Sequence, residues 1–312
     1  MRSSKAAVND RRLSRYSSYN RRDTAAAWLM LAPFLVFFAL FVLYPLVMTF
    51  YYSVTYNNLK QTGGWAGLAH FKYILTRDRH FKMALKNTAV YAAISIVSLT
   101  VLGFLAAAAL NRATRAVKGM RMLMIFPYAT SMTAVAMIWL MLYDKQLGLL
   151  NKALALLGAG KVGWLEDPDL ALYSLIFVNV WKNIGYCMLI YLAGMQSVPK
   201  ELYEAATVDG AGERQKLLHV TLPMIRPVAF FVFITNMVEA FKTFDQVRIM
   251  TDGNPLTNRT TTVVHQIYLR AFVNDYRRID EASAMAVVLL AAAFLLTLIN
   301  YRWNRAIDSD GR

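Results

Sequence analysis

Residues 24–59, "TAAAWLMLAPFLVFFALFVLYPLVMTFYYSVTYNNL", contain no charged side chain. A helix needs about 20 mostly apolar residues to cross the hydrocarbon core of a bilayer. Because no water reaches that core, the backbone polar groups must pair within the chain, as they do in a helix. We therefore predict a membrane-spanning helix over about 25–52, and an all-α integral membrane protein as the fold class.

Three further charge-free runs repeat this pattern, at 88–110, 122–143 and 282–301. The whole chain is 57% hydrophobic and 17% charged, whereas a soluble domain carries about 25% charged residues. Two more apolar segments are interrupted only by isolated charges, which brings the expected number of transmembrane helices to six. The predicted spans cover about 25–52, 86–110, 120–143, 172–197, 223–249 and 281–302.

The net charge of +15 is typical of a membrane protein rather than of a nucleic-acid-binding one. Lys and Arg gather in cytoplasmic loops, where anionic membrane lipid attracts them. The sequence lacks the interleaved basic and aromatic residues that would indicate nucleic acid as a partner. Cys187 is the only cysteine, and the four His residues lie far apart, so we expect no internal disulfide and no metal site.

The distribution of Lys and Arg also predicts the orientation. Seven of them fall within the first 22 residues, which places the basic tail 1–24 in the cytoplasm. With six helices in the domain 25–302, the segment 198–222 and the C-terminal tail 303–312 are then cytoplasmic too.

The segment 198–222 is longer than the 2–8 residues that a simple connection between helices needs. Pro199 suits the first turn of a helix over 200–208, and Asp209-Gly210 is a helix-ending signal. A second short helix can follow over 211–219, after which Thr221 can cap the fifth span. From the residues alone, the segment is either an ordinary surface loop or an element that enters a groove on another protein.

Two polar stripes run along the fourth and fifth spans. Their members are spaced three, four or seven residues apart and so share one face of each helix. A central Lys or Asp costs about 2.5–3.5 kcal/mol on membrane-insertion scales, so such a stripe indicates either a water-filled cavity or hydrogen bonds between helices. A cavity would suit the hydroxyls of a sugar, whereas helix contacts would pair Lys182 with Glu239. The stripe residues are Asn179, Lys182, Asn183, Tyr186, Asn236, Glu239 and Thr243.

The stretch "EAATVDGAGERQKLLHVTLPMIRP", residues 204–227, resembles the cytoplasmic signature of permease subunits of binding-protein-dependent ABC importers. "WAGLAHFKYIL" (65–75), "ALKNT" (84–88), "GLLN" (148–151) and "MTDGNP" (250–255) extend the resemblance to the carbohydrate-uptake branch. The chain looks similar to the larger maltose-type and the glycerol-3-phosphate-type permease subunits. It departs from that pattern at Ser131, where Pro is common, and at Asn254, where Gly is usual.

The resemblance implies a larger assembly in a bacterial-type cell membrane. A second homologous permease, an ABC ATPase dimer and an extracytoplasmic solute-binding protein are the implied partners, and a sugar-like solute is the implied cargo. The cytoplasmic segment would be the coupling helix that docks on the ATPase, and the polar stripes would bind the solute. The implied coupling residues are Glu204, Ala205, Ala206, Asp209 and Gly210.

We expect no cofactor on this chain and no enzymatic activity. It has no phosphate-binding Gly-rich motif with Lys-Ser/Thr, so ATP and Mg²⁺ would bind the partner ATPase. An ion-coupled secondary transporter using Glu239 and Asp245 is the alternative, although it leaves the long cytoplasmic segment without a role. An intramembrane enzyme or a passive anchor ranks last. The solute is left open between a neutral oligosaccharide, an acidic sugar and a phosphate, and Lys182 could contact either of the last two.

Overall fold

The computed structural model describes residues 21–58, 61–111, 114–253, 257–273 and 277–310. The chain divides into two compact units, Met1–Tyr51 and Tyr52–Arg312. Most of the predicted cytoplasmic tail 1–24 lies outside the described residues, as does Asn254, so both expectations stay predictions.

The first unit is one long helix, close to the predicted 25–52. It consists of α2 (Arg21–Phe38), a π-helical turn η1 (Ala39–Leu43) and the start of α3 (Tyr44–Ser53). Pro45, at the beginning of α3, has no N–H to donate, and a widened turn before it absorbs the break in the hydrogen-bond ladder. Large apolar side chains are exposed along this helix, as a helix surrounded by lipid requires.

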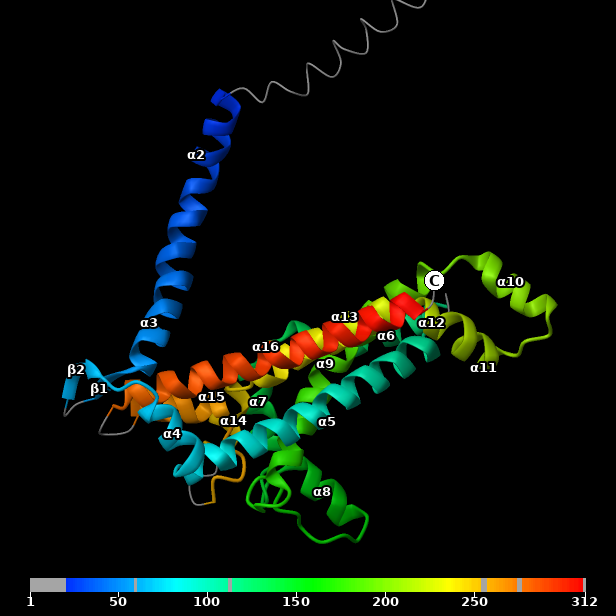
Figure 1. The fold of residues 1–312 in the computed structure, drawn as a ribbon. Coiled ribbons are helices and arrows are strands. Elements are labelled where there is room, and N and C mark those ends of the chain that lie inside the picture. The colour runs from blue at the N-terminus through cyan, green and yellow to red at the C-terminus, as the bar shows by residue number, and fades with distance from the viewer. Residues whose placement is uncertain (1–20, 59–60, 112–113, 254–256, 274–276, 311–312) are drawn as a thin grey trace, which may run out of the picture. The chain divides into compact units, whose positions relative to one another are not determined.

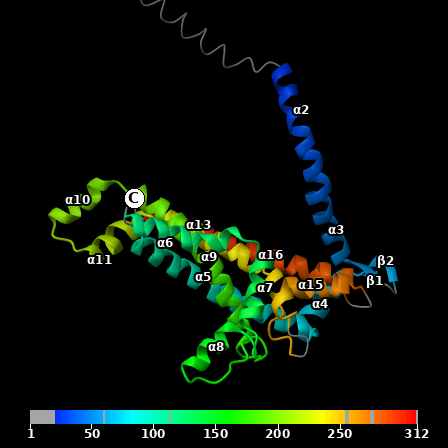
Figure 2. The ribbon, with the colours of Figure 1, turned by 180° about the vertical axis from the view of Figure 1, so that it is seen from behind.

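Four helices form the body of the second unit and run side by side in Figures 1 and 2. They are α5 (Arg79–Ala109), α9 (Ala171–Gln196), α13 (Arg226–Phe241) and α16 (Ile279–Asp310). The α5 helix begins seven residues before the predicted 86, and α16 continues to Asp310, past the predicted 302.

Helix α9 packs between α5 and α6 (Arg115–Ala129). Its closest approach to α6 is at Gly185, where an added Cβ would lie 2.0 Å from the Met124 carbonyl oxygen. Only glycine fits there, because any side chain would collide with the backbone of α6. This contact determines which residues of α9 face the end of α6.

The predicted span 120–143 is not one continuous helix. The structure has α6 and α7 (Met132–Leu142), bent by 100° at Thr130–Ser131. Ser131 caps α7 by accepting a hydrogen bond from the Ala134 N–H at 3.3 Å, so the residue that departs from the family pattern starts a new helix.

The predicted span 223–249 is not one continuous helix either. A short α12 (Leu222–Met224) belongs to a segment that meets α13 at a 69° bend, and α13 ends at Phe241. A separate α14 (Asp245–Met250) follows. Within the described residues, four helices are long and apolar enough to cross a membrane, or up to six if each bent pair is one span.

The remaining elements lie mostly in connecting segments. A small antiparallel hairpin, β1 (Thr55–Asn58) with β2 (Gln61–Trp65), is an addition to the predicted all-α fold, and a bulge separates its Thr55↔Trp65 and Asn57↔Thr62 pairs. Three buried apolar clusters hold the second unit together, the largest of them among α5, α7, α9, α13 and α14. The short helices are α4 (Ala69–Thr76), α8 (Leu149–Leu156), α10 (Lys200–Val208), α11 (Glu213–Lys216), η2 (Leu217–Thr221), α15 (Val263–Tyr268) and η3 (Leu269–Val273).

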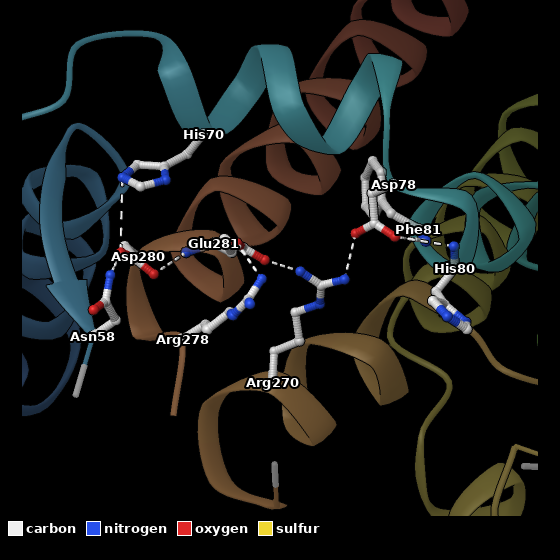
Figure 3. A network of polar contacts seen from close by, with 9 residues as sticks. All are labelled: Asn58, His70, Asp78, His80, Phe81, Arg270, Arg278, Asp280 and Glu281. Carbon is white, nitrogen blue, oxygen red and sulfur yellow. Dashed lines mark hydrogen bonds and ion pairs between the residues drawn. The ribbon is translucent and has the colours of Figure 1, made fainter. Parts of the chain in front are cut away.

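A buried group of charges, the Arg270 network, joins η3 to the starts of α5 and α16 (Figure 3). Arg270 Nη2 lies 2.5 Å from Asp78 Oδ2, and its other terminal nitrogen pairs with Glu281. Arg278 Nη1 lies 2.8 Å from the second Glu281 oxygen. Asp78 also caps α5, since its Oδ1 accepts the backbone N–H groups of His80 and Phe81 at 3.0 and 3.1 Å.

Asp280 extends the network to the hairpin and α4 (Figure 3). Its Oδ2 accepts hydrogen bonds from the Asn57 backbone at 3.2 Å and the Asn58 side chain at 3.0 Å. His70 Nε2 lies 3.9 Å from the same oxygen. The network therefore ties five elements from two distant parts of the sequence, 55–81 and 269–281, into one end of the unit.

Candidate functional site

One cavity of about 550 Å³ lies among α6, α9, α13 and α14. Every residue of the two predicted polar stripes lines this cavity. The structure therefore brings the polar face of the fourth span and that of the fifth span together around one cavity. Whether these residues bind a solute stays a prediction. They are Asn179, Lys182, Asn183, Tyr186, Asn236, Glu239 and Thr243.

The α9 wall of the cavity is organised by contacts with α6. Lys182 is 8% exposed, and its Nζ donates to the Tyr128 carbonyl oxygen at 3.2 Å. The Tyr128 ring stacks on Tyr186, with ring centroids 4.5 Å apart and planes 10° apart. Asn183 Nδ2 donates to the carbonyl and the side-chain oxygen of Asn179, each at 2.9 Å. These contacts fix the positions of the polar side chains relative to the cavity.

The α13 wall combines a buried amide with an exposed ion pair. Asn236 Nδ2 lies 3.3 Å from Cys187 Sγ on α9. Glu239 pairs with Lys242 on its own helix, with Oε1 and Nζ 3.1 Å apart, and both side chains are largely exposed.

The pairing of Lys182 with Glu239 across helices, the alternative to a cavity, is absent within the described residues. Each of the two groups has another partner instead. Among the described residues, Asn236 with Cys187 is the hydrogen-bonded pair through which a stripe residue joins α9 to α13. The stripe side chains otherwise border the cavity.

Tyr128 and Gln246 are among the cavity residues that the sequence interpretation missed. Gln246 Nε2 donates to Thr243 Oγ1 at 3.2 Å and to the Tyr91 hydroxyl, while its Oε1 is buried without a hydrogen-bond partner among the described atoms. Gln246 lies three residues after Thr243, so helical spacing would have placed it on the same stripe. Tyr128 stands in the charge-free run 122–143, where no charged side chain marks it.

The long connection between α9 and α13 has the predicted order of helix, glycine turn and second helix. Helix α10 ends in a Schellman motif. The Gly210 N–H donates to the Thr207 carbonyl at 3.1 Å, and the Ala211 N–H donates to the Ala206 carbonyl at 2.9 Å. Gly210 takes φ +79°, a conformation that favours glycine, and a Cβ there would meet nothing within 4 Å.

Thr221 does not cap the fifth span, contrary to the prediction. It lies inside η2, and its Oγ1 is 2.9 Å from the Tyr203 hydroxyl on α10. The backbone is already helical at Thr221, so the extended conformation of a capping residue is not available. The hydroxyl contact instead ties α10 to the segment that leads into α13.

The residues predicted to contact an ATPase lie on and just after α10. Glu204, Ala205, Asp209 and Gly210 are exposed, and Ala206 is half-buried. Val208 on the same helix is 88% exposed, which is unusual for an isolated apolar side chain at the end of a surface helix. The arrangement leaves this tip of the loop accessible, and its docking role stays a prediction.

A bundle of long apolar helices around a polar cavity is the construction of a multi-pass membrane transport protein. Residues 99–310 match the model of the family described as binding-protein-dependent transport system inner membrane component, and the chain belongs to this family.

Named relatives agree with that assignment over nearly the full length. The chain is 32% identical over 293 residues to the sn-glycerol-3-phosphate transport system permease protein UgpA of Yersinia pestis, covering 92% of this chain and 97% of the relative. It is 32% identical over 286 residues to the probable ABC transporter permease protein YesP of Bacillus subtilis, covering 90% and 91%. The protein is therefore an ABC transporter permease.

A solved structure supports the same fold. One chain of the bacterial alginate ABC transporter, crystallised in complex with an alginate pentasaccharide-bound periplasmic protein, superposes with a TM-score of 0.79 at 25% identity. The match covers 92% of this chain and 97% of that chain.

Proposed function

We propose that this chain is the transmembrane subunit of an ATP-driven importer that takes up a sugar or sugar-like solute by alternating access. The observation that carries the proposal is the single cavity of about 550 Å³ lined by all seven polar stripe residues. Amide, hydroxyl and charged groups are what a polyhydroxylated solute needs in place of water. Two of the relatives are named for glycerol 3-phosphate and for the polysaccharide alginate, which supports this solute class.

In this proposal each bent helix pair crosses the membrane as one span, which gives six spans with both chain ends in the cytoplasm. The α10–α11 loop is then cytoplasmic and forms the coupling helix. A second homologous permease completes the pathway, and a solute-binding protein delivers solute from outside. ATP and Mg²⁺ bind a separate ATPase dimer, whose closure pushes on Glu204, Ala205, Ala206, Asp209 and Gly210.

Purification of the tagged chain in mild detergent tests the assembly. A second permease and an ATPase should co-purify, and the loaded solute-binding protein should stimulate ATP hydrolysis. Recovery of this chain alone, with proton-driven uptake intact, would contradict the proposal and favour a secondary transporter.

The coupling role is tested by Gly210→Trp. The indole would occupy open space in this chain, so we expect normal folding but loss of most ATPase stimulation, because the added bulk blocks docking. Gly158→Trp is the matched control, since Gly158 has φ +75° and equally open surroundings but follows α8. Both variants carry the same backbone strain. Equal loss of stimulation in both, or in neither, would argue against α10 as the docking element.

A further inference from the structure

Lys182 differs from the other charged residues of the cavity in its burial and its partners. Within the described ranges, no carboxylate oxygen lies within 4.0 Å of its Nζ, which donates a hydrogen bond to the Tyr128 carbonyl oxygen at 3.2 Å. A buried charge that lacks a counter-ion is costly, so proteins keep one where it performs a function.

Two contacts of Lys182 can stabilise a positive charge on its Nζ, and neither of them is a countercharge. Tyr128 is one residue from the end of α6, where carbonyl groups lack helical partners and carry the negative end of the helix dipole. The Tyr128 ring adds a cation–π contact, with its centroid 5.2 Å from Nζ. The backbone and a ring stabilise the positive charge, and no countercharge cancels it.

The remaining cavity charges are arranged differently. Glu239 and Lys242 pair with each other and are largely exposed. Asp245 is exposed at the first turn of α14, where free backbone N–H groups favour its carboxylate. The buried part of the cavity therefore carries one uncompensated positive charge, that of Lys182.

We infer that the solute is an anion, carrying a carboxylate or phosphate group, and that Lys182 is the residue that selects it. This inference rests on the proposed function of the cavity. A free carboxylate or phosphate would supply the missing counter-ion, and it would lose its water in exchange for a charge-assisted hydrogen bond. A neutral sugar would leave the buried ammonium uncompensated.

The test is ATP-dependent uptake by the complete transporter in liposomes, with its binding protein present. The probes are glycerol 3-phosphate, a digalacturonate and neutral maltotriose. We expect uptake of glycerol 3-phosphate or of the digalacturonate. The probe that is taken up shows whether the anionic group is a phosphate or a carboxylate. Lys182→Met should raise KM for that probe about tenfold, the usual scale of a lost charge-assisted hydrogen bond.

Two variants separate charge from structure. Lys182→Arg keeps the charge and should retain most of the uptake. Lys152→Met, which removes an exposed lysine of α8 outside the cavity, should change KM less than twofold. Transport of maltotriose alone, or an unchanged KM in Lys182→Met, would overturn the inference while the proposed function stands. Absence of uptake of every probe by an assembled, ATP-hydrolysing wild-type complex would overturn both.

Discussion

Two buried cations in this chain, Arg270 and Lys182, are held in opposite ways. Arg270 lies between Asp78 and Glu281, so its charge is balanced within the chain. Lys182 lies against a carbonyl group and a ring, and its charge is left unbalanced. A balanced buried charge joins structural elements, whereas an unbalanced one is available to a ligand. Removal of the cation should therefore lower the stability of the protein at Arg270, whereas at Lys182 it should leave stability unchanged and impair solute uptake.

The largest effect is expected from Arg270→Met. Removing the guanidinium leaves two buried carboxylates facing each other, which should lower the free energy of unfolding by about 3–5 kcal/mol. Thermal unfolding of the purified protein in detergent measures this. Arg259→Met is the control, because Arg259 pairs with Asp169 on the surface and should cost at most about 1 kcal/mol. Equal losses in the two variants would remove the distinction between buried and exposed pairs.

A smaller, pH-dependent effect on the stability of the folded chain is expected at His265, which is buried like Arg270 and Lys182 but is held neutral. Burial lowers the pKa of His265, although Asp252 lies 3.4 Å away and acts in the opposite direction. The folded chain thus keeps it neutral, while the unfolded chain binds a proton below about pH 6.5. Its contribution to stability is present above that pH and falls as the pH drops toward the folded-state pKa.

We therefore expect the unfolding midpoint of the wild type to fall between about pH 7.5 and about pH 5.5 by more than that of His265→Gln. The difference between the two proteins isolates this histidine from other titrating groups. Parallel pH profiles would show that His265 is equally easy to protonate in the folded and unfolded states.

The smallest effect on stability is expected from Lys182→Met. Methionine has a similar length, and the change leaves no carboxylate unpaired, so the unfolding midpoint should stay unchanged or rise slightly. The same variant should impair uptake of an anionic solute. A loss of stability comparable to that of Arg270→Met would mean that Lys182 is structural, and the contrast between the two sites would disappear.

The sequence predicts well what depends on local patterns. Charge-free runs located the helices that contain 25–52 and 282–301, and an apolar segment with one isolated charge located α9 to within one residue of the predicted 172–197. The Asp209-Gly210 signal located the end of α10. The helical spacing of Asn179, Lys182, Asn183 and Tyr186 was enough to group residues that the structure places at one cavity.

Features that depend on distant contacts were not predictable from the same patterns. The 100° bend at Thr130–Ser131 lies inside a charge-free run, and its local signals are Pro127 and the serine that caps α7. Arg270 and Asp78 are separated by 192 residues, so no spacing rule connects them. Gln246 belongs to the separate helix α14, but its spacing from Thr243 continues the predicted stripe, so a sequence signal for it existed.

The bend between α12 and α13 has a mechanical consequence. Ile225, at the bend, is 1% exposed and belongs to a buried apolar cluster, so the angle of 69° is braced by packing. If α10 has the proposed coupling role, a displacement of α10 would pass to the segment before α13 through the hydrogen bond between Tyr203 and Thr221. The fixed angle at Ile225 would then carry it, in a new direction, to the end of α13 that holds Asn236 and Glu239.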